Sequence, residues 1–234
     1  RSYPGNVEKT ILGHSQTSVF GYVTDGIFQT QEEVNLHAIQ AGKGVGRIRY
    51  ADLNNDGKID PLDQDWLGTT LPDFEYGING ELGYKNLTLS FFIQGVSGKE
   101  VYNSMKGMLT MTHAGSSGMN FGRDTFSGWT PTNTNTNIPA QSLVNNNNET
   151  RSSDYFYVNG SYLKMRSLQI SYNMPLQLIQ RIGIERLRIF LQGQNLFLIK
   201  DTKGKNRYYG PDPEIPGFQY PRPTNLTFGF DIVL

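Results

Sequence analysis

An acidic segment at residues 52–63 combines residue types and a spacing that suit calcium. Oxygen-bearing side chains stand at positions one, three, five, nine and twelve, and Lys58 at position seven offers its backbone carbonyl. Calcium prefers about six to eight hard oxygens on a short, flexible loop, and Gly57 lies at position six, where such loops turn sharply. The sequence therefore predicts a structural Ca²⁺ site. Its expected ligands are Asp52, Asn54, Asp56, Lys58, Asp60 and Asp63.

The segment departs from a standard calcium hand at its last position, where Asp63 replaces the usual bidentate glutamate. This shorter carboxylate is similar to that of the variant loops of dockerins. No helix signal precedes Asp52, because residues 47–50 read as a strand, so we expect a single loop rather than a paired sensor. Ile59 is the apolar residue expected to anchor the loop. The alternative is a solvated turn without metal, since Asp, Asn and Gly also cluster in turns.

Other residues with catalytic potential do not form a recognisable site. His14, His37 and His113 are far apart and lack metal-ligand spacing. The chain contains no nucleophile-elbow motif and no zinc-protease motif. Asp63 and Asp65 could be read as the carboxylates of a glycosidase, but they lie in or beside the calcium-like segment. An enzyme is therefore the least favoured class, and no catalytic residue is expected.

Two tryptophans are candidates for contact with a ligand. Trp66 and Trp129 lie in predicted loops of a tyrosine-rich chain, and an aromatic face suits the apolar patch of a sugar ring. They could contact a substrate or a covering partner, and they could equally be packing residues.

Composition excludes several classes of protein. The 234 residues include 21 basic and 21 acidic side chains, whereas a nucleic-acid binder normally carries a basic excess. Cysteine is absent, which excludes disulfide scaffolds, thiolate metal sites and cysteine nucleophiles. No apolar run is long enough for a transmembrane helix. Low charge, 26 glycines and 12% aromatic residues indicate a β-rich chain with long polar loops.

Alternation of apolar and polar residues predicts long strands from residue 74 onward. The first two strands form a hairpin around a turn at Lys85 and Asn86, and each has one apolar and one polar side. These strands are longer than the usual five or so residues of soluble sheets, and they approach the length that a membrane-spanning strand needs. The predicted strands are 74–84, 87–94, 162–172, 187–197 and 226–234.

The remaining segments are mostly predicted as loops. Residues 1–29 read as irregular, with a short strand at 19–23, and a capping box at Thr30 predicts a helix over residues 31–40. Residues 98–157 have weak periodicity and read as a long polar loop, which is uncommon in a compact soluble domain. Outer-membrane barrels, by contrast, combine short turns on one side with long loops on the other.

Several motifs together resemble the C-terminal part of SusC/RagA-type TonB-dependent outer-membrane receptors. The resemblance runs over nearly the whole chain. One departure is Leu234 at the last position, where outer-membrane strands usually finish in Phe. The motifs that carry it are residues 22–30, 48–57, 68, 72–77, 89–95, 129–134, 160–166, 193–197 and 228–230.

The resemblance implies an all-β fold: the C-terminal strands of a large antiparallel transmembrane β-barrel, about 22 strands when complete, with long extracellular loops. Residues 1–73 would form an extracellular loop region with the short helix and the calcium-like loop. Residues 74–234 would carry the barrel strands, with the long loop at 98–157. The plug, the early strands and the signal peptide would lie outside this chain, and the remaining strands of the same receptor would close the barrel.

The resemblance also implies a function in the outer membrane, the import of glycans or peptides without catalysis. The implied partners are a SusD-like surface lipoprotein, TonB through an N-terminal part absent from this chain, an oligosaccharide or peptide ligand, and outer-membrane lipid, but no nucleic acid. The strands alone leave an alternative. They also fit a soluble secreted β-domain that binds carbohydrate and is stabilised by calcium, in which the apolar strand faces would form a core.

Overall fold

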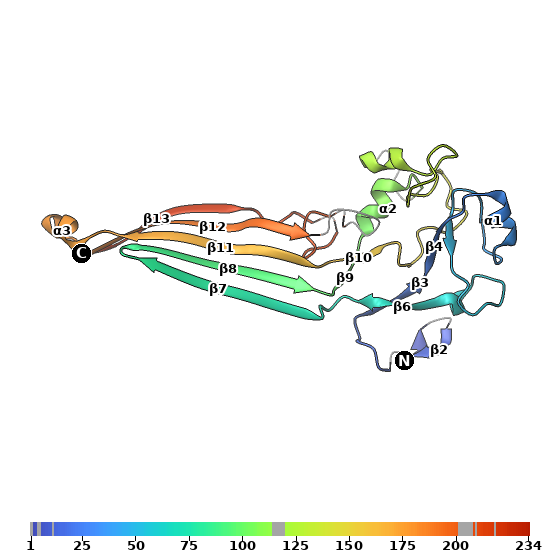
Figure 1. Cartoon of the computed structure of the whole chain (residues 1–234), viewed down its shortest axis with the longest axis horizontal. Helices are drawn as coiled ribbons and strands as arrows, with labels where there is room; N and C mark the ends of the chain where they lie inside the picture. Colours follow the sequence, from blue (N-terminus) through green and yellow to red (C-terminus); the bar gives the residue numbers. More distant parts are fainter. Residues whose placement is uncertain are drawn as a thin grey trace.

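Five long antiparallel strands form one extended sheet, and shorter strands, helices and loops gather into a head at one end of it (Figure 1). The computed structural model describes residues 2–3, 6–10, 12–113, 120–200, 208, 210–217 and 219–234. We call the five strands the long sheet, and residues 12–73 and 98–159 the head. Strands dominate the regular structure, as the all-β prediction requires. In the part of the chain that is described, no helix is long and apolar enough to cross a membrane.

The long sheet has the strand order β13-β12-β11-β8-β7, and each neighbouring pair is antiparallel. The five strands predicted from alternation are confirmed, with shifts of a few residues at their ends. The predicted turn at Lys85 and Asn86 is confirmed as well, and Lys85 adopts a φ of +53° there. The strands are β7 (Phe74–Tyr84), β8 (Leu87–Ser97), β11 (Tyr162–Asn173), β12 (Arg186–Lys200) and β13 (Asn225–Val233).

The register divides the long sheet into an apolar face and a polar face, because residues paired across strands point to the same side. The apolar face is exposed: Leu82 is 63% and Phe228 70% accessible. It is therefore not the core of a soluble domain within the described chain. One apolar row crosses the sheet through Leu82, Leu89, Ile170, Leu191 and Phe228, and the polar row beside it is Glu81, Ser90, Gln169, Gln192 and Thr227.

Glycines let large rings lie across neighbouring strands of this sheet. Gly95 pairs with Tyr76, and a Cβ atom at Gly95 would overlap the tyrosine ring. Gly229 pairs with Phe190 in the same way, with a Cβ atom 2.5 Å from the ring. Such aromatic-over-glycine contacts help to fix the register of a sheet.

The head is built from two-stranded sheets and short helices. A hydrophobic core lies at its centre and combines residues from both sides of the β7–β8 hairpin in the sequence: Ile48, Tyr50, Met111, Tyr155 and Phe156. The pairs in the head are β3 (Ser18–Tyr22) with β6 (Gln64–Thr69), β4 (Thr24–Ile27) with β5 (Ile48–Tyr50), and β9 (Glu100–Tyr102) with β10 (Tyr157–Asn159). A further pair, β1 (Ser2–Tyr3) with β2 (Asn6–Thr10), precedes the head in the sequence. The helices are α1 (Gln31–Leu36), η1 (Pro61–Asp63), α2 (Ser104–Thr110) and η2 (Arg123–Ser127), while α3 (Leu176–Ile179) and η3 (Gln180–Ile182) lie at the far end of the long sheet (Figure 1).

Residues 98–157 contain more order than their weak periodicity predicts. Besides β9, α2 and η2, this segment carries several fully buried polar residues, among them Asn147 and Glu149. The Glu149 carboxylate accepts hydrogen bonds from the backbone N–H of Ile48 at 3.0 Å and from Arg47 at 3.2 Å. The Asn147 side chain accepts from Gln40 at 2.6 Å and donates to the Ile48 carbonyl at 2.9 Å. Buried polar anchors, rather than an apolar stripe, hold this part of the loop to the head.

Helix α1 begins where the capping box predicts but ends four residues early. Thr30 accepts a hydrogen bond from the N–H of Glu33 at 3.2 Å. The prediction of helix as far as Gln40 is wrong, because the chain becomes extended at His37. Ile39 then forms a bridge with the acidic segment: its N–H donates to the Gly57 carbonyl at 2.8 Å. This tertiary backbone pairing replaces the last turn of the expected helix.

Ion pairs hold the connection between β12 and β13 against the polar face of the long sheet. We call its described residues 208 and 210–217 the strap. Lys164 on β11, whose side chain is 3% accessible, lies 2.7 Å from both Asp212 and Glu214 of the strap. Arg166 on the same strand lies 2.7 Å from Glu214. Although burial opposes it, hydrogen bonds from these two cations lower the pKa of Glu214 to about 2.

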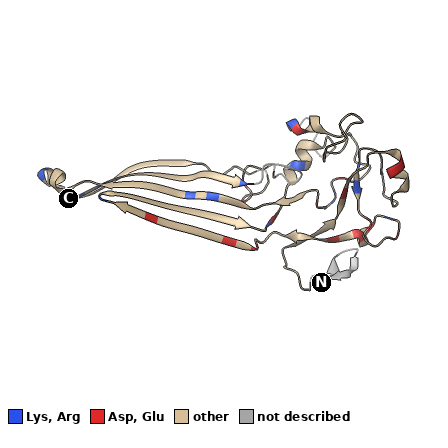
Figure 2. Cartoon of the chain, viewed as in Figure 1, with Lys and Arg blue, Asp and Glu red and all other residues tan. Residues whose placement is uncertain are grey.

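Figure 2 shows that charged residues are sparse along the long sheet and more frequent in the head. The cluster around Lys164 is therefore an exception that needs a structural reason. Desolvated charges are tolerated when each is paired, and here each lysine or arginine meets a carboxylate of the strap. The cluster thus holds a long connection in one place over the polar face.

The strap contact predicts a specific effect of Lys164→Met. Removing one member of a buried ion pair typically costs about 3–5 kcal/mol. We expect amide hydrogen exchange to rise in residues 210–217, while the pairing of β11 with β8 and β12 stays protected. Lys85→Met, at the exposed β7–β8 turn, is the matched control. Unchanged exchange in residues 210–217 of the Lys164 variant would mean that other contacts hold the strap.

Candidate functional site

The acidic segment forms a compact loop in which side-chain oxygens accept hydrogen bonds from the loop's own backbone. Asp52 accepts from the N–H of Gly57 at 2.9 Å, Asn54 from Asp56 at 3.0 Å, and Asp56 from Lys58 at 3.0 Å. Gly57 has a φ of +83°, the left-handed conformation that the sharp turn requires. The first half of the loop therefore has its carboxylates and amide turned inward.

The second half of the loop is closed by Asp63, which is fully buried. One carboxylate oxygen accepts from the N–H of Leu53 at 2.9 Å, and the other accepts from the N–H of Asp60 at 2.8 Å. The Lys58 ammonium lies 3.0 Å from Asp60 and 3.6 Å from Asp56. Asp63 thus joins the two ends of the loop through backbone hydrogen bonds, and the pKa of Asp60 is lowered by donors from Leu62 and Lys58.

Two observations bear on the fit of a cation. The second carboxylate oxygen of Asp52 is buried and has no hydrogen-bond partner, which suits a bound cation. However, no group of three or more His, Cys, Asp or Glu side chains is placed to hold a metal ion anywhere in the described residues. Ile59 packs against the core cluster of the head, as expected of an anchor. The ligand set predicted for calcium stays a prediction.

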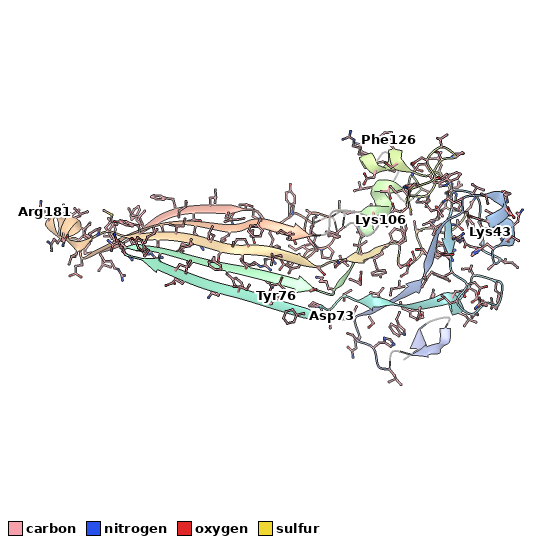
Figure 3. The ribbon with its side chains drawn as sticks, viewed as in Figure 1. Lys43, Asp73, Tyr76, Lys106, Phe126 and Arg181 are labelled. Atoms are coloured by element: carbon pink, nitrogen blue, oxygen red, sulfur yellow. The ribbon has the colours of Figure 1, made fainter. Side chains whose placement is uncertain are left out.

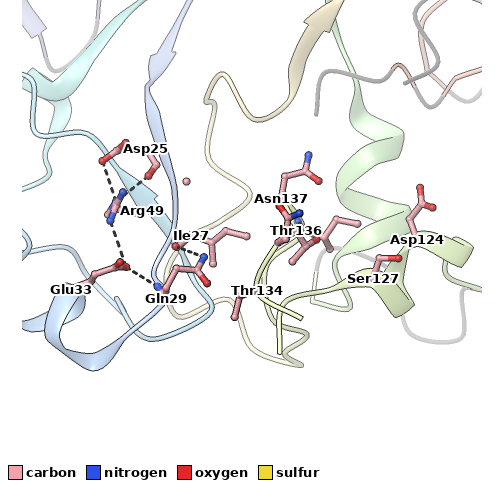
Figure 4. Close-up of a pocket in the computed structure, with 13 residues that line it drawn as sticks. Asp25, Ile27, Gln29, Glu33, Arg49, Asp124, Ser127, Thr134, Thr136 and Asn137 are labelled. Atoms are coloured by element: carbon pink, nitrogen blue, oxygen red, sulfur yellow. Dashed lines mark hydrogen bonds and ion pairs between the residues drawn. The ribbon is translucent and has the colours of Figure 1, made fainter. Parts of the chain in front are cut away.

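A polar cavity of about 590 Å³ lies elsewhere in the head (Figure 4). One wall comes from β4, the start of α1 and β5, and the opposite wall comes from η2 and the loop that follows it. These two walls are about a hundred residues apart in the sequence. The lining residues are Asp25, Gly26, Ile27, Gln29, Glu33, Arg49, Asp124, Ser127, Thr134, Asn135, Thr136, Asn137 and Ile138.

The first wall is held by a set of planar polar groups, drawn with dashed lines in Figure 4. The Arg49 guanidinium lies 3.1 Å from the Asp25 carboxylate and 3.6 Å from the Glu33 carboxylate. Glu33 also accepts from the N–H of Gln29 at 2.7 Å. The Gln29 amide donates to the Ile27 carbonyl at 2.9 Å. Each planar group has a fixed orientation, so this wall is organised before any ligand arrives.

The second wall is a polar loop fixed by backbone contacts. The Asn133 amide donates to the carbonyls of Ser127 and Gly128, both at 3.1 Å. Thr136 accepts from the N–H of Ile138 at 3.1 Å. The N–H of Ala140 donates to the Gly46 carbonyl at 2.8 Å, which ties this loop to the first wall. The Thr- and Asn-rich stretch that the sequence marks only as polar is therefore one side of a cavity.

A smaller chamber of about 200 Å³ adjoins the cavity and shares Gly26, Ile27, Thr136 and Asn137 with it. Lys106 of α2, labelled in Figure 3, lines this chamber. Its ammonium donates to the Tyr155 carbonyl at 2.7 Å and lies 3.6 Å from the centre of the Tyr155 ring, and burial lowers its pKa to about 8.

Asp154 faces the same chamber from the other side. It accepts two hydrogen bonds from Thr24, one from the backbone N–H at 2.9 Å and one from the hydroxyl at 2.6 Å. Burial raises the pKa of this carboxyl, opposed by these bonds and by Lys106. The chamber is therefore lined by one carboxyl group, Asp154, and one ammonium group, Lys106, whose charges offset each other.

Both tryptophans that were predicted as ligand contacts make packing contacts within the head. The Trp66 ring stacks on His14 with centroids 4.0 Å apart, and Phe20 meets it edge-on at 5.2 Å. Trp129 is only 8% accessible, and its indole N–H donates to Gln29 at 2.8 Å, behind the cavity wall. Contact of either tryptophan with substrate or lid stays a prediction.

Comparison with curated proteins finds relatives over most of the chain. A receptor named TonB-dependent receptor P3, from Formosa agariphila, is 32% identical over 203 residues, which cover 86% of this chain and 19% of the relative. TonB-dependent receptor P26 of the same organism is 28% identical over 240 residues, covering 96% and 23%. SusC of Bacteroides thetaiotaomicron is 24% identical over 225 residues, covering 93% and 20%. The chain thus spans about a fifth of the length of these relatives. No protein family profile matches it.

Solved structures of the RagAB peptide transporter have the same fold. One superposes with a TM-score of 0.71 over 92% of this chain and 22% of the other, at 18% identity. The open-open state of the RagAB peptide importer gives 0.65 over 91% and 22%, also at 18% identity. The strand-rich, antiparallel architecture matches these proteins over nearly all of the chain. The resemblance predicted from the sequence motifs is therefore confirmed: over most of its length the chain is similar to part of the SusC/RagA-type TonB-dependent receptors.

Proposed function

We propose that this chain is part of an outer-membrane receptor that imports glycans or peptides with energy from TonB. The observation that carries the proposal is the exposed apolar face of the long sheet, which crosses all five strands. A large exposed apolar surface marks a contact with lipid or protein. The relatives named above are receptors rather than enzymes, which supports transport without catalysis.

In this proposal the apolar face meets outer-membrane lipid and the polar face lines the lumen of a barrel of about 22 strands. Among the described strands, β7 and β13 each pair with one neighbour in the long sheet, so both have an edge available for further strands. The remaining strands of the same receptor would pair there and close the barrel. The alternative of a soluble secreted carbohydrate-binding β-domain is disfavoured, because it would leave the apolar face in water.

The head would then lie on the extracellular side, where long loops of such barrels gather. We propose that it contacts the ligand and a SusD-like surface lipoprotein, with Trp66 and Trp129 supporting these contacts from behind. RagAB, to which the chain is similar in fold, is described as a peptide importer.

We also propose that residues 52–63 bind a structural Ca²⁺ through the predicted ligands. The inward-facing oxygens of Asp52, Asn54 and Asp56 and the unpartnered Asp52 oxygen support this assignment. Calcium would add a central tie to a loop that Asp63 already closes. The ion would then stiffen the head rather than act as a switch.

The orientation of the long sheet is tested by a matched pair of substitutions on neighbouring positions of β12. Leu191→Arg places a charge on the apolar face, where a mid-membrane arginine costs about 2–4 kcal/mol. Gln192→Arg places the same charge on the polar face. We expect little assembled receptor for Leu191→Arg and a normal amount for Gln192→Arg. The measurement is the amount of heat-modifiable barrel in outer-membrane fractions. Equal assembly of both would exclude lipid contact by this face.

Import itself is tested with strains that lack the receptor or lack TonB. We expect both strains to lose growth on the same glycan or peptide source, while uptake of small sugars through porins is unchanged. Complementation with the wild-type receptor should restore growth only when TonB is present. Full growth of the receptor-deficient strain on every source that the parent uses would contradict the proposal.

The calcium assignment is tested by Asp52→Asn combined with Asp56→Asn in the full-length receptor. Each change keeps the shape of the side chain and removes a hard anionic ligand, so we expect at least a tenfold loss of Ca²⁺ affinity by calorimetry. Chelation should raise hydrogen exchange in residues 50–70 and leave the long sheet protected. Asp73→Asn, outside the loop, is the control. Unchanged affinity in the double variant would make the loop a metal-free turn.

A further inference from the structure

We propose that the 590 Å³ cavity of the head is a binding subsite for one uncharged saccharide unit of the imported ligand. The inference rests on the proposed import function and adds to it the site and the chemical class. It follows from the cavity's size, the polarity of its lining, the fixed orientation of its groups and the sign of its charge.

The size and the polarity of the cavity both suit a ligand rich in hydroxyl groups. Ligand pockets typically measure about 300–1,000 Å³ and are mostly apolar. This cavity falls within that range, but apart from Gly26, Ile27 and Ile138 every lining residue carries a polar side chain. An apolar ligand would leave those donors and acceptors unsatisfied, at a cost for each of them. A ligand that presents hydroxyl groups in several directions satisfies them.

The orientation of the first wall suits such a ligand. Arg49 holds the Asp25 and Glu33 carboxylates, and the Gln29 amide is bonded at both ends, to Ile27 and to Trp129. Planar groups held in this way can accept and donate toward neighbouring hydroxyls without losing rotamer freedom on binding. Preorganisation of this kind lowers the cost of association.

Charge selects against acidic ligands. The lining contains three carboxylates, Asp25, Glu33 and Asp124, and its single cation, Arg49, is paired with two of them. In the adjoining chamber Lys106 faces Asp154, so no cationic excess arises there. Uronic acids and sulfated sugars would therefore be repelled, since like charges at close range destabilise a complex.

A peptide is less well matched to this cavity. Apolar side chains of a bound peptide would need apolar pockets, and the two isoleucines of the lining are themselves at most 7% accessible. Most lining residues carry polar side chains, so the cavity suits hydroxyl groups better than an apolar peptide side chain. The polar loop wall, with Ser127, Thr134 and Asn135 exposed, is the part that a sugar would contact.

The test is calorimetry on the full-length receptor in detergent. The probes are neutral oligosaccharides (maltose, cellobiose, xylobiose, mannobiose and lactose), digalacturonate as the acidic sugar, and trialanine as the peptide. We expect at least one neutral sugar to bind, and digalacturonate to bind at least tenfold more weakly. Ser127→Ala combined with Thr134→Val should weaken neutral sugar binding at least tenfold.

Thr132→Val is the matched control, because Thr132 lies in the same loop but does not line the cavity. It should leave sugar affinity unchanged. The inference is overturned if no neutral sugar binds, if the double variant binds as well as the wild type, or if digalacturonate binds equally. Trialanine binding that the double variant abolishes would assign the cavity to peptides. Each of these outcomes leaves the TonB-dependent growth test unaffected, so failure of this site and failure of import are distinguishable.

Discussion

The opposite character of the two faces of the long sheet is the constraint on which the rest of the structure depends. Side chains alternate between faces along each strand, and the register aligns apolar with apolar residues across all five strands. Burial of apolar surface contributes about 25 cal/mol per Å², so an uncovered face of this size would drive aggregation in water. In the proposed receptor, lipid would remove that penalty on one side, and the polar side would face water or protein.

The head shows how long connections become ordered without long helices or strands. Ordering each backbone residue costs about 1–2 kcal/mol, which irregular loops must offset by other contacts. Here the offset comes from buried polar side chains that bond to distant backbone groups. Glu149 and Asn147 hold the Ile48 strand, and Lys164 holds the strap. The Glu149 and Asn147 contacts join segments on both sides of the β7–β8 hairpin, so these two parts of the head are ordered together.

The strands could be predicted from the sequence because alternation is a local signal, and the motifs were sufficient to recognise the family. The end of α1 could not be predicted, because Ile39 is extended and pairs with Gly57 instead of continuing the helix. No local pattern reveals that contact. The order within residues 98–157 was missed for the same reason: Asn147 and Glu149 bond to partners about a hundred residues away. The cavity was missed because its two walls come from distant segments, and no local pattern shows that they face each other. Several wall residues stood out only as parts of family motifs, among them Asp25, Arg49 and Thr134.

The acidic loop and the cavity are coupled through α1. Helix α1 carries Glu33 into the cavity wall, and Ile39, shortly after the end of the helix at Leu36, is bonded to the acidic loop through both its N–H and its carbonyl. Its N–H donates to Gly57 at 2.8 Å, and its carbonyl accepts from Ile59 at 2.9 Å. If the acidic loop loosened, the chain after α1 would lose these two hydrogen bonds. Glu33, the α1 carboxylate that pairs with Arg49, would then be held less firmly. In the proposed receptor, a Ca²⁺ ion at residues 52–63 would hold the end of α1, and with it Glu33, and so would favour the organised cavity without any contact between ion and ligand.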